Sequence, residues 1–228
     1  MAAPTFVAAG SYLSEGGGNS ANIGAPSGVQ AGDIVLIMLY HEHEGSAATP
    51  SSVPSGFTEI HSEHTTGDVS HSRLYWKRSS GSEPSSYNFS FSNSNWRTGY
   101  SVAFRGCVSS GDPVDAFDGN TSGSNNSGSS APAVSLTTTG PDRMLVYFCS
   151  NYVTTAWELP SGFTAFEPAG KPSPRCILGG GYQVQAAAGS TGPLVATGSH
   201  NGVRTAHVLA LKPDETASSA PRRLFLPF

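Results

Sequence analysis

Hydrophobic and polar positions along this chain alternate over short segments, and clusters of turn-forming residues separate those segments. Residues 87–91 read Tyr-Asn-Phe-Ser-Phe, an alternation that is typical of a half-buried β-strand. Two longer apolar runs, residues 34–40 and 144–149, each follow a Gly-Asp or Pro-Asp turn. No segment carries apolar residues at helical spacing over three turns. The pattern predicts an all-β protein.

Both halves of the chain show the same series of expected strands. We expect strands at residues 6–9, 21–24, 34–40, 57–61, 72–77, 87–91 and 98–104, and again at residues 116–119, 134–137, 144–150, 163–167, 177–184, 194–196 and 205–211. About seven short strands per hundred residues, with turn signals between them, indicate a β-sandwich or barrel.

An internal duplication explains this recurrence. Residues 31–40 match residues 140–149 at an offset of 109, and the Pro-Ser-Gly-Phe-Thr turn at 54–58 recurs at an offset of 106. The closing strand at 97–104 recurs at an offset of 107. Three matches in the same order, at nearly equal offsets, predict two repeats at about residues 4–106 and 113–212.

The repeats leave two domain arrangements open. The Ser-, Gly- and Asn-rich tract at residues 120–130 is typical of a flexible linker between independent domains. A Gly-rich stretch at residues 15–20 occupies the matching place in the first repeat, however, which indicates a loop inside the repeat. We therefore favour one antiparallel β-sandwich or jelly roll over residues 1–212, in which both repeats contribute strands to shared sheets.

The tail at residues 213–228 lies outside both repeats. After a polar spacer it ends in two arginines and an apolar group, namely Arg222, Arg223, Leu224, Phe225, Leu226, Pro227 and Phe228. Two interpretations stay open, a tail folded back onto the sandwich and a docking peptide that enters a groove of a partner subunit.

Composition excludes several classes of function. Charged residues make up 12% of the chain and the formal net charge is −4, so no basic surface for nucleic acid is expected. We expect no signal peptide, because the first residues show no basic region followed by an apolar run. We expect no membrane partner, because the longest apolar run, residues 34–40, is too short to span a bilayer. The three cysteines lack CxxC spacing, which argues against a disulfide framework or a zinc site.

Five of the seven histidines fall between residues 41 and 71. His41 and His43 share one side of an extended strand, so they could share a transition metal with His61, His64 or His71. The second repeat has none of these histidines, and solvated loop histidines are the simpler interpretation. Asp112, Asp115 and Asp118 lack the spacing of a calcium loop. We therefore expect no bound metal and no cofactor.

Exposed aromatic residues are the stronger candidates for binding. Trp96, Trp157 and Tyr152 stand in polar surroundings, where aromatic rings can stack on sugars or anchor a protein interface. The same rings could instead cap the open ends of the sandwich core. No nucleophile elbow and no paired carboxylates are visible, so no catalytic residue is expected and the chain is predicted not to be an enzyme.

Several motifs resemble a β-sandwich domain that is common in structural proteins of tailed bacteriophages and in some bacterial surface proteins. They are Gly32-Asp33, Pro54-Ser55-Gly56-Phe57-Thr58, Tyr75-Trp76-Lys77, Ser82-Glu83-Pro84-Ser85-Ser86-Tyr87-Asn88-Phe89, Ala103-Phe104-Arg105-Gly106 and Asp112-Pro113-Val114-Asp115. The match covers about residues 4–212. Because these are turn and core motifs, they indicate a fold more strongly than a function.

The resemblance implies a concanavalin-like jelly roll in a virion. We accordingly expect an accessory structural protein, a head decoration or a tail-surface subunit, that is made in the host cytoplasm and forms homo-oligomers in the particle. Its expected partners are capsid or tail subunits, which Arg222–Phe228 would contact. The alternative is a carbohydrate-binding module that recognises a host surface glycan through Trp96, Trp157 and Tyr152.

Overall fold

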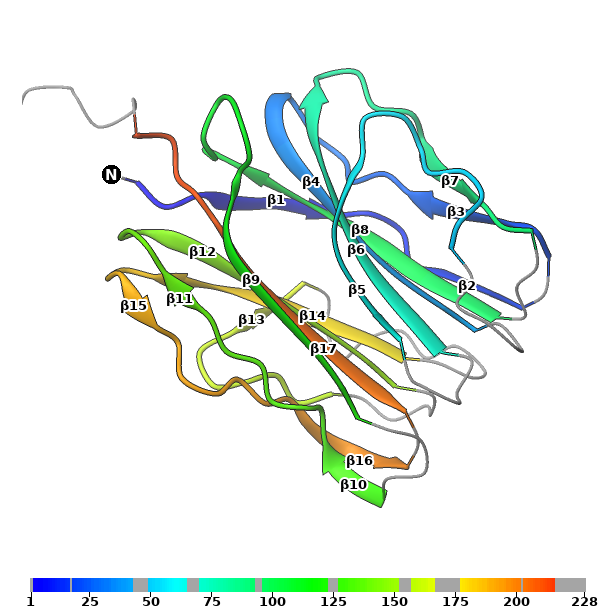
Figure 1. The fold of residues 1–228 in the computed structure, drawn as a ribbon. Helices are drawn as coiled ribbons and strands as arrows, with labels where there is room; N and C mark the ends of the chain where they lie inside the picture. The colour runs from blue at the N-terminus through cyan, green and yellow to red at the C-terminus, as the bar shows by residue number, and fades with distance from the viewer. Residues whose placement is uncertain are drawn as a thin grey trace, which may run out of the picture.

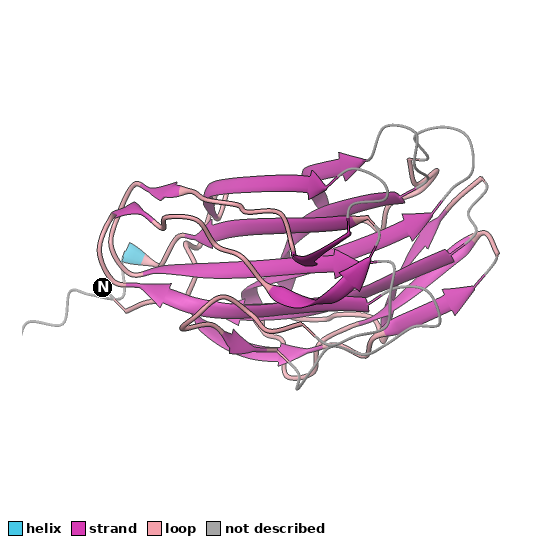
Figure 2. Ribbon diagram, turned by 90° about the horizontal axis from the view of Figure 1, so that it is seen from below, coloured by secondary structure: helices cyan, strands magenta, loops and turns pink. Residues whose placement is uncertain are grey.

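The protein is all-β. The computed structural model describes residues 2–16, 18–42, 49–64, 70–92, 96–122, 127–151, 157–166, 177–201 and 203–215. These segments form seventeen strands and no α-helix, and all strand pairs are antiparallel. The short helical piece in Figure 2 is a 3-10 turn at Glu215. The predicted fold class is thus confirmed. Across the described segments, no helix combines the length and hydropathy that a membrane span needs.

The first half of the chain forms one large sheet, here called sheet I. Its order is β1 (Thr5–Ala9), β8 (Trp96–Arg105), β4 (Ala31–Glu42), β6 (Ser70–Ser80) and β5 (Thr58–His64), and β2 (Leu13–Gly16) pairs with β8 beside β1. A two-stranded sheet of β3 (Ser20–Gly24) and β7 (Ser86–Ser90) accompanies it.

The second half forms a corresponding sheet, here called sheet II. Its order is β13 (Thr164–Ala165), β14 (Ile177–Gln185), β12 (Arg143–Asn151), β17 (Arg204–Leu211) and β9 (Val114–Ser122). Two small pairs accompany it, β10 (Ser127–Ser130) with β16 (Thr197–Asn201) and β11 (Thr137–Thr138) with β15 (Gly189–Ser190).

Sheets I and II pack face to face (Figure 1) and enclose the largest apolar cluster. Ile34, Leu36 and Met38 of β4 and Val146 and Phe148 of β12 belong to this cluster. Because side chains of a strand alternate between its two faces, these positions lie two residues apart. The expectation that both repeats contribute strands to shared sheets is therefore wrong, because each described sheet contains strands of one half only. The shared cluster still joins the two halves of the chain through a common interior.

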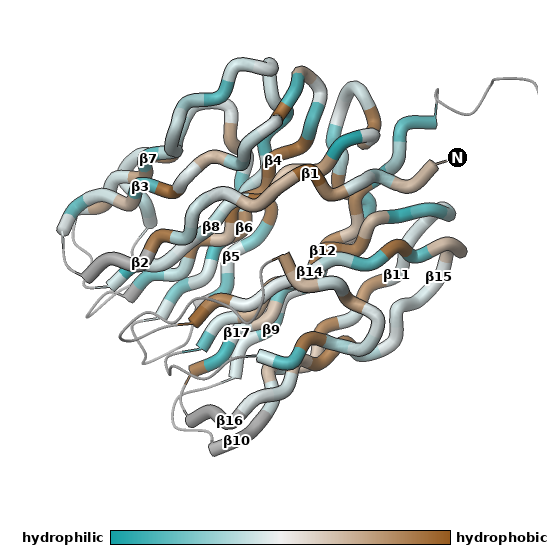
Figure 3. The backbone as a smooth tube through the Cα atoms, turned by 180° about the vertical axis from the view of Figure 1, so that it is seen from behind, coloured by the Kyte–Doolittle hydropathy of each residue, from teal (hydrophilic) through white to brown (hydrophobic). Residues whose placement is uncertain are grey.

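The small sheets cover the outer faces of the large ones. Val35, Ile37 and Leu39 of β4 pack with Tyr87 and Phe89 of β7, and a similar cluster lies outside sheet II. Burial on both faces explains why residues 34–40 are apolar without a break, as in other strands covered on both sides. In Figure 3 the most hydrophobic stretches accordingly lie along inner strands such as β4 and β12.

The two large sheets share one pairing scheme. The order β1-β8-β4-β6-β5 in sheet I corresponds to β9-β17-β12-β14-β13 in sheet II. Both first strands also carry a register shift at the same place, between Phe6 and Ala8 opposite β8 and between Val114 and Ala116 opposite β17. Duplication of one unit would produce this correspondence between sheets I and II, and we interpret the correspondence in this way.

The sheets correct the alignment of the repeats by one residue. An offset of 109 would place Ile34 with Arg143, yet Ile34 faces the shared cluster, as Met144 does. Ile34 pairs with Phe104, and Met144 pairs with Leu211. Shifting a strand by one residue would move each side chain to the opposite face, so the faces require Ile34 to correspond to Met144.

The Pro-Ser-Gly-Phe turns are alike in both halves. Phe57 N donates to Pro54 O over 3.3 Å, and Phe163 N donates to Pro160 O over 3.2 Å. The glycines between them, Gly56 and Gly162, have φ values of 85° and 87°. Glycine adopts this left-handed conformation without the steric penalty of a side chain, which explains the recurrence of the motif.

The polar tract at residues 120–130 is partly strand, contrary to the loop that its composition predicts. β9 continues to Ser122, and β10 begins at Ser127 and pairs with Asn201 and His200 of β16. Backbone hydrogen bonds at the margin of the molecule require no apolar side chains, so composition did not reveal these strands.

Candidate functional site

The strands run between two ends of the molecule (Figure 2). We call them the Asp33 end, where β4 begins, and the His41 end, where β4 finishes. The chain leaves β17 at the Asp33 end, where Asp214 N donates to Gly106 O over 2.8 Å and Val108 N donates to Lys212 O over 3.0 Å. The second half of the chain is thereby attached to the segment that connects the two halves.

Several predicted site residues lie outside the described residues. They are Tyr152, His43 and all of Arg222, Arg223, Leu224, Phe225, Leu226 and Phe228.

The two tryptophans that were candidates for sugar binding differ in their exposure to solvent. Trp157 is only 7% exposed and packs in the apolar cluster outside sheet II. It therefore fits the core-capping interpretation and has little surface for a ligand. Trp96 is half-buried, at the first residue of β8 and at the His41 end.

His41 is a buried core residue. Its ring stacks on that of His71, its neighbour in the β4–β6 ladder, with centroids 5.0 Å apart and an interplanar angle of 18°. The ring of Phe91 lies 5.0 Å from it on another side. The rings of His41 and His71 therefore lie side by side. Within the described segments no group of three or more His, Cys, Asp or Glu side chains has the geometry of a metal site.

Another histidine, His207, lies between the two sheets. Its Nε2 is 2.7 Å from Ser72 Oγ on β6, and both side chains are fully buried. Burial, and after it the charge of the neighbouring His61, lowers the pKa of His207 to about 3. The imidazole is thus neutral across the physiological range. A Ser–His pair with no exposed surface offers no path for a substrate to the hydroxyl.

His61 and Glu63 on β5 extend this polar group towards solvent. His61 Nε2 and Glu63 Oε1 are 2.7 Å apart. The His61 ring lies 5.6 Å from the His207 ring, nearly perpendicular to it, and 5.3 Å from Phe117 on β9. Gly119 makes room for the ring, because a Cβ there would stand 2.5 Å from His61 Cδ2.

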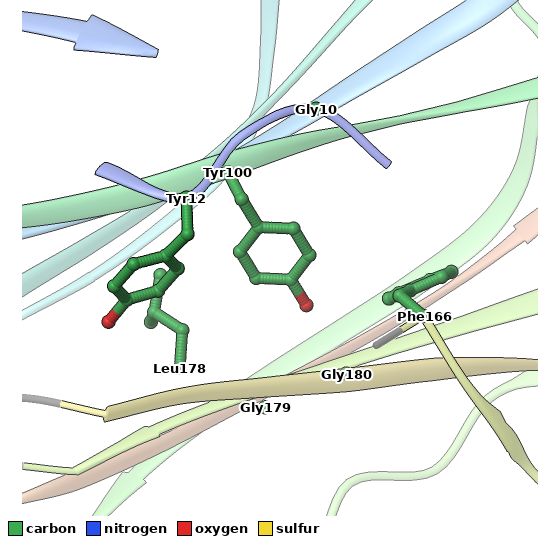
Figure 4. Close-up of a pocket in the computed structure, with 7 residues that line it drawn as sticks. All are labelled: Gly10, Tyr12, Tyr100, Phe166, Leu178, Gly179 and Gly180. Atoms are coloured by element: carbon green, nitrogen blue, oxygen red, sulfur yellow. The ribbon is translucent and has the colours of Figure 1, made fainter. Parts of the chain in front are cut away.

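The corresponding place in the other half is apolar. Tyr100, which matches His207 at the offset of 107, packs on Phe148 and Phe166 with ring centroids 5.7 and 6.1 Å apart. Tyr100 and Phe166, together with Tyr12 and Gly10, border a hollow of about 20 Å³ (Figure 4). That volume suits about one water molecule and is far below that of a site for a sugar or drug-sized ligand.

The run Gly179-Gly180-Gly181 lets side chains lie directly on β14. A Cβ on Gly179 would stand 2.8 Å from Trp157 Cδ1, and one on Gly180 would stand 2.2 Å from the Tyr100 hydroxyl. A Cβ on Gly181 would meet Thr164 O at 2.5 Å. The absence of side chains in this run therefore serves packing within a strand.

The three aspartates near the start of β9 each accept from backbone amides. Asp112 Oδ1 accepts from Val114 N, Asp118 Oδ2 from Ser135 N, and Asp115 Oδ2 from Thr139 N. Burial opposes ionisation of Asp115, but hydrogen bonds from Thr139 and Arg143 outweigh it and keep its pKa below the usual range. These carboxylates tie β9 to neighbouring loops.

The motifs that carry the family resemblance converge on one another. Lys77 Nζ is 2.8 Å from Glu83 Oε2, and the Tyr87 hydroxyl donates to the same oxygen over 2.9 Å. The ammonium also lies 5.7 Å from the ring centroids of Phe57 and Tyr87. Three motifs thus form one cluster, which joins the Pro-Ser-Gly-Phe turn to β6 and β7.

A second motif cluster closes the Asp33 end of sheet I. Arg105 donates from Nε and Nη2 to the two oxygens of Asp33, over 3.0 and 2.7 Å. Asp33 Oδ2 also accepts from Gln30 N over 2.8 Å. The Gly-Asp and Phe-Arg-Gly motifs are therefore two parts of one structural ion pair.

Comparison of the chain with family models, with curated proteins and with solved structures gave no match. The function must therefore be inferred from the geometry and from the sequence motifs.

Proposed function

We propose that this protein is a non-catalytic accessory structural protein of a bacteriophage virion, either a head decoration or a tail-surface subunit. The observation that carries the proposal is burial of both faces of the central strands of both large sheets, β4 and β8 in sheet I and β12 and β17 in sheet II. The hollow at Tyr100 is too small for a ligand, and the Ser72–His207 pair is enclosed. Such an interior suits a rigid module that contacts other proteins through the ends and edges of its sheets.

The motif clusters support the family side of this proposal. Glu83, Lys77 and Tyr87, and separately Asp33 and Arg105, hold turns and strands in place. Their resemblance to the phage-associated domain therefore concerns the residues that build the fold. Because one fold serves many functions, the virion assignment needs a direct test.

The placement of the tail in the particle is part of the proposal. Asp214 lies at the Asp33 end, while Trp96 and the end of β4 lie at the opposite end. Arg222, Arg223 and the apolar residues Leu224–Phe228 would dock into a groove on a capsid or tail subunit. The His41 end would then point away from the particle, and copies of the protein would form a homo-oligomer on its surface.

Removal of residues 216–228 tests the anchor. This deletion leaves Asp214 N bonded to Gly106 O, so the sandwich should keep its midpoint of thermal unfolding. We expect the full chain in mass spectra of purified virions, and we expect the truncated chain to lose most of its occupancy. Equal occupancy of both chains excludes the tail as anchor, and absence of the full chain from virions excludes the virion function.

A glycan array tests the carbohydrate alternative. Trp96 is the described candidate that keeps partial exposure, so Trp96→Ala should abolish any sugar binding, while Phe117→Ala serves as the control at an exposed ring elsewhere. Binding that Trp96→Ala removes would favour the alternative. An array without any bound glycan would eliminate it.

A further inference from the structure

The β5–β9 seam is the line along which the free edges of sheets I and II meet. β5 is the last strand of sheet I, β9 is the last strand of sheet II, and they lie against each other. The contact includes the His61 ring, which packs on Phe117 and over Gly119. Each strand pairs with a single neighbour, β6 or β17, so each can move without breaking a central ladder.

Directly inside this seam stands His207, bonded to Ser72. Among the described residues His207 Nδ1 has no hydrogen-bond partner, and a Cβ on Gly119 would stand 3.0 Å from it. The buried face of the imidazole therefore lies behind the backbone of β9. A proton on His207 would leave a charge in an apolar interior beside a second imidazole, a costly arrangement without a partner.

We propose that the β5–β9 seam is an acid-labile closure of the sandwich, which opens as His207 takes up a proton. In the closed form the neutral imidazole bonds Ser72 across the two sheets. In the open form solvent reaches the ring and hydrates its charge. Acid shifts the equilibrium because only the open form binds the proton readily.

The groups around His207 determine the sign of this effect. From β5, His61 and Glu63 face it, and their own pairing leaves Glu63 to balance a charge on His61. From β12 the ladder neighbour of His207 is Phe148. From β4 the ladder neighbour of Ser72 is Tyr40, whose phenol donates to Ser70 Oγ over 2.8 Å. Asp118 on β9 bonds Ser135 N on the outer side. No described carboxylate directly balances a charge on His207, and the depressed pKa of this histidine, about 3, agrees with that geometry.

Hydrogen exchange of the full chain between about pH 7.5 and 5 tests the proposal. After correction for intrinsic rates, we expect the protection of the β5 and β9 amides to fall by up to about tenfold per pH unit below about 6.5, since opening takes up one proton. The amides of β1 and β14 beside Tyr100 are the internal control and should change much less. Equal changes at both places would overturn the proposal.

Two variants, His207→Gln and His61→Gln, test which histidine takes up the proton. His207→Gln can still bond Ser72 and should remove the pH dependence of seam protection, whereas His61→Gln keeps His207 and should retain most of it. An unchanged pH dependence in His207→Gln overturns the proposal. Should that variant fail to fold, the imidazole carbon shifts of the parent decide: a His207 ring still neutral at about pH 5 supports the proposal, and titration near 6.5 contradicts it.

Discussion

Tyr100 and His207 occupy matching positions on β8 and β17 and face opposite sheets, yet their surroundings differ completely. Tyr100 stands among aromatic rings and glycines. His207 bonds Ser72 and contacts His61. At the offset of 106, Leu178 near Tyr100 also corresponds to Ser72 near His207. One backbone arrangement thus accepts an apolar filling around Tyr100, here called the apolar seam, and a polar filling around His207 at the β5–β9 seam, here called the polar seam.

The comparison shows which feature of the interior the fold requires. The space between the sheets must be filled, because an empty or unpaired position costs free energy. Rings fill it around Tyr100, where stability should not depend on pH near neutrality. A buried hydrogen bond fills it around His207, and stability there depends on the neutral imidazole. The polar seam consequently adds a pH response that the apolar seam lacks.

Removal of an aromatic ring from the apolar seam should have the largest effect. Phe166 is buried and packs within 6.2 Å of the ring centroids of Phe6, Tyr100, Phe104, Phe148 and Tyr182. Phe166→Ala should lower the free energy of unfolding by about 3–5 kcal/mol, as measured by urea denaturation. Phe117→Ala, at a ring that is 48% exposed, is the matched control and should cost less than about 1 kcal/mol. Similar losses in both variants would contradict the assignment of Phe166 to the core.

A methyl group on the glycine run should have the next largest effect. The Cβ of Gly180→Ala would meet the Tyr100 hydroxyl at 2.2 Å and Tyr147 O at 2.8 Å. Overpacking of this kind costs about 1–3 kcal/mol. In a double-mutant cycle, Tyr100→Phe should recover part of the loss by removing the nearer atom. If Tyr100→Phe recovers none of the lost stability, the contact with the Tyr100 hydroxyl is not the cause of the loss.

The pH dependence of stability should give the smallest effect. The folded pKa of His207 is about 3 and its ordinary value is 6.5, so the unfolded chain binds more protons below 6.5. This histidine's contribution is complete above about pH 6.5 and is lost as the pH falls, by about 1.4 kcal/mol per unit. Denaturation midpoints at about pH 7.5 and 5.5 should therefore differ in the parent chain.

His207→Gln is the comparison that isolates this term. The variant should show about 1.4 kcal/mol less change over the same interval. The carboxyl groups of Asp115 and Glu83 have lowered pKa values, and their contributions are lost only in more acidic solution. An equal slope in parent and variant would place the titrating group elsewhere.

The strand pattern was predictable because it depends on local chemistry. The alternation at residues 87–91 and the Pro-Ser-Gly-Phe turns predicted β7 and the starts of β5 and β13 closely. The four short or polar strands β2, β10, β15 and β16 were not predicted. Their pairing is through the backbone, and Ser127–Ser130 contains only Ser and Gly, so no side-chain period marks them.

The candidate site was far less predictable. His207 lies 135 positions from Ser72, and no motif joins them. The one available signal in the sequence was that the first repeat has Tyr100 where the second repeat has His207. This difference marks a position where the two halves differ in chemistry. Trp157 stands among polar residues in sequence, yet it packs on Gly179, a contact that its neighbours in the chain do not reveal.

The sequence alone determined the all-β class, the turns and the two matching series of strands along the chain. Each of these features depends on residues that are close together in the chain. Only the tertiary structure showed that the sheets of the two halves pack face to face and that Ile34 corresponds to Met144. Only the tertiary structure showed that Ser72, His61 and His207 meet between the sheets. Those features depend on register and on packing across the two sheets. A one-residue shift reverses the faces of a strand, and no local preference of the chain distinguishes the two registers.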